Sequence, residues 1–307
     1  ASLTVTDNQG ATARDTAVVT VTTGGGTSTG AFRWNQQVAP ATLDDAAHGM
    51  GVAVDSVGNT IMVGDLHSTV NFGSGPVSGG QGDLFVAKYA PTGTLQWVKR
   101  LAGYNDLADS RMAGVAVDAN DDIVVTGYFS TTINLGGGTL SALDGLDIFL
   151  AKYSSSGTHL WSKRLGGANS FDKTSGVALD SSGNIAITGQ FTTATDLGGG
   201  TLTGGSLGTV FVAKYSPSGA HLWSRGLGIW RQSSGGVAVD GSGNIAVTGG
   251  VADTADFGGG PVSGMGGMDV SVAKYTPSGG LLWAKRSGST LEDQGRGVTI
   301  ATNGDVV

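Results

Sequence analysis

Short runs of apolar residues alternate with turns rich in Gly, Ser, Asn and Asp along most of the chain. Residues 113–118 alternate small and apolar side chains, as a half-buried strand does, and residues 123–128 form a β-branched run. A Gly-rich connection leads to a third run at 147–153, and the turn at 154–157 leads to a fourth, Trp-containing run at 159–165. Tight hairpins require the Pro and Gly that such turns carry. The pattern predicts four antiparallel strands in this unit.

The unit recurs along the chain. The segment Gly-Val-Ala-Val-Asp begins at Gly51 and returns in steps of 60–63 residues, at Gly114, Gly176 and Gly236 and in altered form at Gly297. An Ala-Lys-Tyr segment and a single Trp keep the same period. Repeated units of four strands and this length are typical of propeller blades, whereas a β-solenoid has much shorter repeats. We therefore predict an all-β fold, a partial β-propeller of four-stranded antiparallel blades with about 4.5 repeats.

The markers also predict the domain organisation. Residues 23–30 form a Gly/Thr/Ser linker of the flexible class, and the propeller repeats cover residues 31–307. Small residues suit the crowded strand nearest the axis, so we expect the Gly-Val-Ala-Val strand to be innermost and the Trp strand to be outermost. The expected blades are about 51–103, 114–167, 176–228 and 236–288, with partial strands at 31–38 and 297–307 that share one incomplete blade or form opposite open ends.

Three repeated segments carry a family resemblance. Gly-Val-Ala-Val-Asp, Ser-Gly-Asn-Ile-Ala-Val-Thr-Gly and Phe-Val-Ala-Lys-Tyr occur in order and at fixed distances over residues 31–307. They resemble the SBBP family, the beta-propeller repeat of bacterial surface and secreted proteins. The resemblance implies a propeller in an extracellular or cell-surface setting, and it implies no catalytic residue. Residues 1–22, with their Thr-Asp-Asn-Gln-Gly hairpin, resemble the C-terminal strands of a PKD domain, an immunoglobulin-like β-sandwich module of exported bacterial proteins.

Composition narrows the function. The net charge is −7 and no basic run occurs, so we expect no nucleic-acid partner. The absence of Cys excludes disulfides and thiolate metal sites. No apolar stretch approaches the roughly 18 residues of a membrane-spanning helix, so we expect no transmembrane segment in these residues. The sequence also lacks the nucleophile-elbow, zinc-protease and P-loop motifs, and we predict that it is not an enzyme.

Side chains that recur in each repeat favour structural roles. The Trp residues are expected to fill the wedge between adjacent blades. His159 and His221 occupy a position that holds Leu95 in another repeat, which indicates a need for bulk. His48 and His67 are single residues that lack a His or Cys partner at metal-ligand spacing. The repeated basic residues are expected at the outer edge of each blade, where charge discourages edge-to-edge aggregation; they are Lys88, Lys152, Lys214, Lys274, Lys99, Arg100, Lys163, Arg164, Lys285 and Arg286.

Two groups of residues remain as candidate sites. Trp230 breaks the Trp period, and with Arg231 it forms a candidate ligand contact in the loop before Gly236. Acidic residues precede most innermost strands, on connections that share one face with the long loops, so we expect them to ring the mouth of the central channel. Gathered carboxylates favour a neutralising cation, and calcium accepts oxygen ligands in flexible geometry. The expected metal ligands are Asp45, Asp109, Asp172 and Asp293.

The combined expectation is a non-catalytic, extracellular or cell-surface binding or scaffold module. It would present an extracellular protein or polysaccharide ligand to its loop-rich face, and calcium is the one cofactor that the sequence favours. One alternative is a fragment of a propeller-type polysaccharide hydrolase or lyase, which needs two carboxylates roughly 5–9.5 Å apart with one raised pKa. The other alternative is a structural spacer.

Overall fold

The computed structural model describes residues 2–6, 16–20, 39–40, 47–80, 82–104, 111–205, 208–229 and 235–307. In these ranges the chain forms strands and turns and no helix, which confirms the predicted all-β class. No helix in the described ranges is therefore long and apolar enough to cross a membrane. The first two strands, β1 (Ser2–Thr6) and β2 (Thr16–Thr20), form an antiparallel pair of their own.

The described residues then form four blades, each a sheet of four antiparallel strands that lie in sequence order. The first blade contains β4 (Ala47–Val54), β5 (Thr60–Leu66), β8 (Asp83–Tyr89) and β9 (Leu95–Tyr104). The second contains β10 (Arg111–Val117), β11 (Ile123–Phe129), β14 (Gly145–Tyr153) and β15 (His159–Leu165). The third contains β17 (Lys173–Leu179), β18 (Ile185–Phe191), β21 (Thr209–Tyr215) and β22 (His221–Ile229). The fourth contains β23 (Val237–Val239), β24 (Ile245–Asp256), β25 (Pro261–Tyr275) and β26 (Leu281–Ser287).

The long connections between second and third strands form small hairpins. In the second blade, β12 (Thr132–Asn134) and β13 (Thr139–Ser141) pair with each other, and β12 also pairs with β9 of the first blade. The sheet order β13-β12-β9-β8-β5-β4 therefore joins two consecutive repeats. In the fourth blade, β24 and β25 extend into this connection as one long hairpin, with a register shift between Ala252 and Thr254. The remaining short strands are β3 (Ala39–Pro40), β6 (Val70–Asn71), β7 (Pro76–Val77), β16 (Ser170–Phe171), β19 (Ala194–Asp196) and β20 (Thr201–Thr203).

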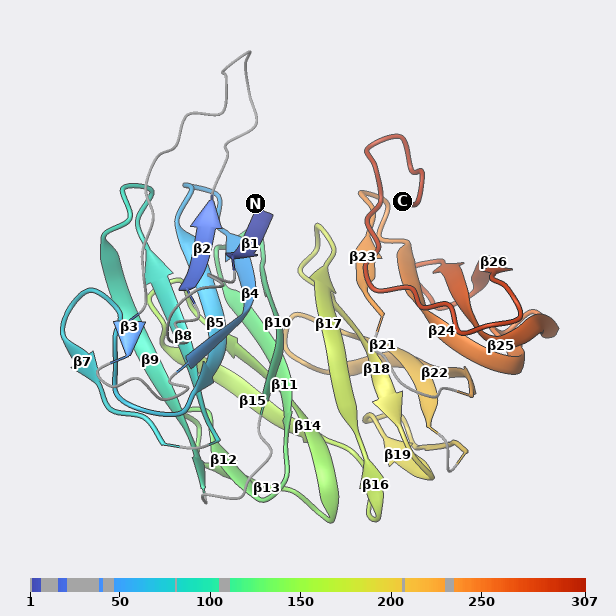
Figure 1. Ribbon diagram of the computed structural model, residues 1–307, viewed down its shortest axis with the longest axis horizontal. Helices are drawn as coiled ribbons and strands as arrows, with labels where there is room; N and C mark the ends of the chain where they lie inside the picture. Colours follow the sequence, from blue (N-terminus) through green and yellow to red (C-terminus); the bar gives the residue numbers. More distant parts are fainter. Residues whose placement is uncertain are drawn as a thin grey trace.

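Glycine permits the innermost strands to lie close together. Strands β4, β10, β17 and β23 lie next to one another across the middle of the molecule (Figure 1). A Cβ on Gly114 would lie 3.7 Å from the Cα of Gly176, and one on Gly236 would lie 3.2 Å from the Cα of Gly297. The Trp-containing strands β9, β15, β22 and β26 form the opposite side of each four-stranded unit. The predicted order, with Gly strands inside and Trp strands outside, is confirmed.

The chain continues beyond the fourth blade beside β23. Residues 299–307 form a hairpin turn in which Thr299 and Val307 exchange backbone hydrogen bonds of 2.9 and 3.0 Å. The partial strand expected at 31–38 and the linker at 23–30 lie outside the described residues.

The hydrophobic core lies between the blades. The second and third strands of the first blade are buried along their whole length. Ile61 and Val86 of the first blade pack in one cluster with Ile123 and Phe149 of the second. Similar clusters join the second blade to the third and the third to the fourth. Each sheet therefore depends on its neighbours to cover its apolar faces.

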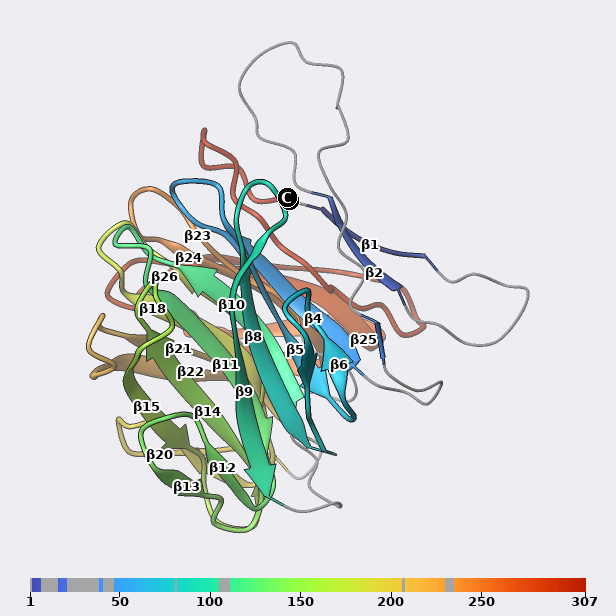
Figure 2. The same cartoon turned by 90° about the vertical axis from the view of Figure 1, so that its left-hand side faces the viewer.

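The alternating strand directions give the molecule two ends, which are followed separately below. The hairpin end holds the turns from first to second and from third to fourth strand. The loop end holds the long second-to-third connections and the connections between blades. Figure 2 shows the strands of the first sheet, β9, β8, β5 and β4, side by side.

Candidate functional site

At the hairpin end, one Asp organises the first turn of every blade. The Asp118 Oδ1 atom accepts hydrogen bonds from the backbone N–H groups of Asn120 and Asp122, at 2.8 and 3.0 Å. This arrangement is an Asx turn, which fixes the β10–β11 hairpin. The same role falls to Asp55, Asp180 and Asp240. The segment at 118–122 is therefore a hairpin turn.

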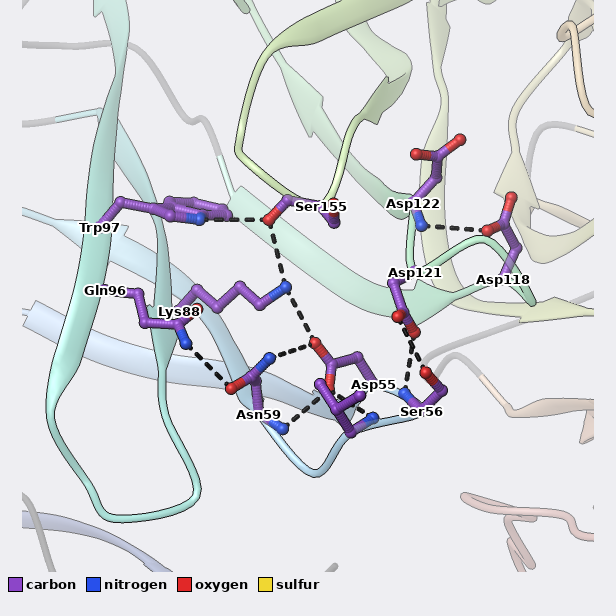
Figure 3. Close-up of polar contacts among 11 residues, drawn as sticks. Asp55, Ser56, Asn59, Lys88, Gln96, Trp97, Asp118, Asp121, Asp122 and Ser155 are labelled. Atoms are coloured by element: carbon purple, nitrogen blue, oxygen red, sulfur yellow. Dashed lines mark hydrogen bonds and ion pairs between the residues drawn. The ribbon is translucent and has the colours of Figure 1, made fainter.

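A buried Lys on the third strand completes this arrangement. Lys152 Nζ lies 2.7 Å from Asp118 Oδ2 and 3.1 Å from Asp122 Oδ2, and the Lys152 side chain is 7% exposed. Lys88 pairs in the same way with Asp55 at 2.8 Å and also donates to the Ser155 carbonyl of the next blade (Figure 3). The equivalent pairs in the last two blades are Lys214–Asp180 and Lys274–Asp240, both at 3.0 Å.

The predicted outer-edge role of these four lysines is wrong. They lie on the third strand of each sheet, inside the blade, and are buried because an Asp carboxylate neutralises each ammonium group. The arginines of the fourth strand are also paired rather than left as edge charges. Arg100 Nε lies 2.6 Å from Asp83 Oδ2, and Arg164 Nη1 lies 2.8 Å from Asp147 Oδ2.

The Trp residues join each blade to the next at the hairpin end. Trp97 Nε1 donates to the Ser155 carbonyl at 3.3 Å, as Figure 3 shows. A Cβ on Gly157, in the same turn, would lie 3.3 Å from the Trp97 ring, and the φ of Gly157 is +80°. The turn therefore needs Gly both for its backbone and for contact with the ring. Trp161 and Trp223 make the same contact to Pro217 and Pro277, which confirms the predicted wedge position.

Hydrogen bonds set the charge state of the hairpin-end carboxylates. Desolvation by burial raises the pKa of Asp240, but hydrogen bonds from Asn244, Lys274 and the backbone N–H groups of Asn244 and Ser242 outweigh it and lower this pKa to about 2. The pKa values of Asp55 and Asp180 are lowered by the same balance. These carboxylates are fully charged at neutral pH and serve the fold.

The loop end differs from blade to blade. A β-bulge interrupts the innermost strand just before the first Gly of each repeated Gly-Val-Ala segment in the first three blades; in the first blade it lies between Gly49 and Gly51. A bulge turns the residues before it to the other face of the strand. As a result, the residue opposite His48 is Asp65, the residue opposite Arg111 is Tyr128, and the residue opposite Lys173 is Gln190.

Contacts between blades connect these side chains. Arg111 Nη1 lies 3.7 Å from Asp65 Oδ2, and the Arg111 side chain is 49% exposed while that of Asp65 is buried. Lys173 Nζ lies 4.8 Å from the centroid of the Tyr128 ring, within the range of a cation–π contact. The loop-end cluster therefore runs across three blades and consists of His48, Asp65, His67, Arg111, Tyr128 and Lys173.

Three members of this cluster could hold a metal ion. The ligand atoms of His48, Asp65 and His67 all lie within 4.8 Å of one another, and the two imidazole rings meet edge to face at 5.4 Å. Along the chain, 19 residues separate His48 from His67, so their spacing does not indicate this group. His159 and His221, in contrast, stack edge to face on Tyr153 and Tyr215, which confirms the need for bulk at that position.

The four acidic residues predicted from the sequence are only partly described. Asp45 and Asp109 lie outside the described residues, as do Trp230 and Arg231. Asp172 and Asp293 occupy equivalent positions of two blades, where their backbone N–H groups donate to Leu146 and Met268 of the preceding third strand, both at 2.7 Å. Calcium binding by this set stays a prediction.

The carboxylates of Asp172 and Asp293 each accept hydrogen bonds from residues within five positions along the chain. Asp172 accepts hydrogen bonds from the Gly167 N–H and the Ser170 hydroxyl, and its side chain is fully buried. Burial raises the pKa of Asp172 to about 6, and the nearby Asp147 carboxylate adds to the rise. Asp147 is fully buried too, which separates this carboxylate pair from solvent. Asp293 accepts hydrogen bonds from the backbone and side chain of Ser289.

Two pockets lie at blade junctions rather than at the loop-end cluster. One of about 400 Å³ is lined by Arg164 and Leu165 of the second blade and Tyr215 and His221 of the third. The other, of about 450 Å³, is mostly apolar and lies between Trp283 of the fourth blade and the segment that ends at Val307.

Comparisons with known proteins agree with the repeat architecture. The family described as SBBP, beta-propeller repeat, matches residues 160–190, which cover β16 and β17 and most of β15 and β18. An uncharacterised WD repeat-containing protein of Acanthamoeba polyphaga mimivirus is 28% identical over 138 residues, which are 43% of this chain and 9% of that protein. The match thus spans less than a tenth of the viral protein.

Two solved structures are also similar. A protein of unknown function from Bacteroides caccae matches with a TM-score of 0.37 and 9% identity, over 86% of this chain and 88% of that one. A catalytically inactive virginiamycin B lyase from Staphylococcus aureus with quinupristin matches with a TM-score of 0.29 and 10% identity, over 86% and 92% of the two chains. The sheet order and the SBBP match over residues 160–190 together support a partial β-propeller fold.

Proposed function

We propose that the chain is a non-catalytic binding module of an extracellular or cell-surface protein and that its loop-end cluster binds an acidic polysaccharide. One observation carries the proposal. The positions that repeat in each blade are used in contacts within and between blades, whereas the loop-end positions of successive blades hold different charged and aromatic side chains. A ligand bound near the axis meets several blades at once, so blade-specific side chains there can fix its orientation.

The chemistry of three side chains favours an acidic polysaccharide. Arg111 and Lys173 begin neighbouring innermost strands, and the Tyr128 ring lies beneath the Lys173 ammonium group. A guanidinium group binds carboxylates through two parallel hydrogen bonds, and an aromatic ring offers an apolar face to a sugar. The net charge of the whole chain is −7, so this attraction acts locally and weakens in salt.

The cellular setting belongs to the same proposal. Residues 31–307 resemble the repeats of bacterial surface and secreted proteins, and residues 1–22 resemble the end of a PKD domain. The antiparallel pairing of β1 with β2 is compatible with that origin. An exported protein would meet polysaccharides of the envelope or of the surroundings.

Affinity electrophoresis in gels containing polygalacturonate, alginate or neutral dextran tests the ligand. We expect the wild-type chain to be retarded by an acidic polymer and not by dextran, with less retardation in salt. The double variant Arg111→Ala/Lys173→Ala should lose about tenfold in affinity or more, which corresponds to 1.4 kcal/mol. The matched control, Lys99→Ala/Lys163→Ala, removes the same charge from the outer strands and should bind like the wild type.

Three results would overturn the proposal. The absence of retardation by either acidic polymer would favour a spacer. An equal loss in the control pair would indicate non-specific charge attraction. The release of new reducing ends or unsaturated sugars from a polymer would favour the hydrolase or lyase alternative.

A further inference from the structure

The first blade gathers three side chains of metal-binding types at the loop end. Asp65 lies on β5 and His67 follows the end of that strand, and the ligand atoms of both lie within 4.8 Å of that of His48. The bulge before Gly51 places His48 directly opposite Asp65 on β4. The equivalent cross-strand pairs of the next two blades are Arg111–Tyr128 and Lys173–Gln190, which offer no such set. Among the first three blades, whose first and second strands pair in the described residues at this position, only the first blade has this group.

We propose that His48, Asp65 and His67 form a binding site for a divalent transition metal, with zinc as the ion whose preferences they fit. Two imidazoles and one carboxylate are a ligand set that zinc accepts. The ligand atoms already lie within 4.8 Å of one another. A tetrahedral site with bonds of 2.0–2.2 Å needs them about 3.4 Å apart, so the ligand atoms must approach one another by up to about 1.4 Å.

The position of the group has consequences for what the metal can do. Asp65 is buried, whereas His48 and His67 are half-buried, so the ion would be reached from the solvent side of the loop end. Three protein ligands leave at least one coordination position for water or for an oxygen atom of a bound molecule. The metal would therefore be an exchangeable contact point at the loop end rather than a closed structural centre. This inference does not depend on the acidic polysaccharide.

Arg111 acts as the competing cation. Its guanidinium group lies 3.7 Å from Oδ2 of the Asp65 carboxylate, the group that a metal would use, and about half of its side chain is exposed. An incoming ion replaces one positive charge beside Asp65 with another, and the exposed Arg111 side chain can turn toward solvent. Removal of the Arg111 charge should consequently strengthen metal binding, a response that a purely structural ion pair would not give.

Metal titration of the purified full chain tests the site. After treatment with a chelator, Zn²⁺ is titrated by calorimetry at neutral pH, and Co²⁺ is titrated by its visible absorption, which reports coordination geometry. We expect one equivalent of each ion to bind. His48→Gln and His67→Gln should each weaken binding by roughly tenfold or more, and Arg111→Gln should strengthen it. His159→Gln, which removes an imidazole that stacks on Tyr153, is the matched control and should leave binding unchanged.

The outcomes are decisive in both directions. No binding below millimolar metal, or binding that survives both His48→Gln and His67→Gln, would overturn the site. Weakening in His159→Gln equal to that in His67→Gln would point to adventitious surface binding and would overturn it too. Circular dichroism verifies the fold of each variant, and His67, which follows the end of β5, offers a substitution outside the strand if His48→Gln fails to fold. A loss of polysaccharide binding without any change in metal binding would defeat the proposed function and leave this site intact.

Discussion

The hairpin end and the loop end belong to the same four sheets, yet they use polar residues in opposite ways. At the hairpin end, every blade pairs a buried Lys with a turn Asp, and Trp97, Trp161 and Trp223 each donate to the next blade. At the loop end, the first blade has His48 and Asp65 where the second has Arg111 and Tyr128. Repetition at one end marks residues that build the fold, and the departure from repetition at the other is where we propose that a ligand binds.

The largest expected effect comes from removing one hairpin-end Lys. Lys152→Ala leaves the buried Asp118 carboxylate without its ammonium partner and should cost about 3–5 kcal/mol in the free energy of unfolding. Lys173→Ala at the loop end removes a cation–π contact and should cost only about 0.5–1 kcal/mol. Urea denaturation of the two variants measures the difference. Equal losses would remove the distinction between the two ends.

A smaller effect is expected where the third blade departs from the others. Its third strand begins with Thr209, and Gly226 stands where Arg100, Arg164 and Arg286 stand elsewhere, so this blade lacks both partners of the Asp–Arg pair. Thr209→Asp alone puts a carboxylate at a position that is 6% exposed and should cost about 1–3 kcal/mol.

A double-mutant cycle with Gly226→Arg completes this test. Gly226 is exposed and a Cβ there meets only ordinary contacts at 3.4 Å or more, so Gly226→Arg alone should be close to neutral. The double variant should recover part of the loss, with a coupling energy of about 0.5–3 kcal/mol. A coupling energy of zero would show that the missing pair has no structural value at this blade.

The two ends should also respond differently to pH. The folded pKa of Asp172, about 6, is above its ordinary value of 3.8, so the protonated form is favoured in the folded state. The contribution of Asp172 to the free energy of unfolding is therefore fully present below pH 3.8 and is lost as pH rises through 6. The wild type should therefore gain about 1 kcal/mol between pH 7.5 and pH 5 relative to Asp172→Asn.

At the hairpin end the sign reverses. The folded pKa of Asp240, about 2, is below 3.8, so its contribution is present above pH 3.8 and is lost as pH falls through 2. Thermal melts of wild type, Asp172→Asn and Asp240→Asn across this range separate the two windows. A loss of stability on going from pH 7.5 to pH 5 that is the same in wild type and Asp172→Asn would refute the assignment for Asp172.

The sequence predicted the blades because their causes are local. Strand alternation, turn residues and the crowded Gly of each innermost strand can all be read within a few residues. The pairing of Lys152 with Asp118 could not be read in this way, because 34 residues separate them and the partner is defined only by the order of strands in the sheet. The lysines were for that reason assigned to the wrong place, although the neighbouring Trp residues were assigned correctly.

The site in the first blade was missed for a more specific reason. Continuing the pairing of Gly51 with Val63 without a bulge would place His48 opposite the buried Leu66. The extra residue at Met50 shifts the register by one, so His48 lies opposite Asp65 instead. Spacing along the chain cannot show this shift, which leaves the Met50 side chain exposed.

The contacts between adjacent blades also affect how the array can lengthen by duplication of a repeat. Lys88 and Trp97 reach forward to the turn of the following repeat, while β12 reaches back to β9 of the preceding one. Each repeat therefore contributes to one junction with the repeat before it and to another with the repeat after it. The cooperative unit of folding is accordingly a pair of neighbouring repeats rather than a single repeat. The forward contact recurs, because Trp161 and Trp223 reach the turns of the following repeats as Trp97 does, whereas β19 and β20 form a separate pair. Duplication of a repeat can therefore reuse the Trp contact at each new junction, while the loop end is left open to diverge copy by copy.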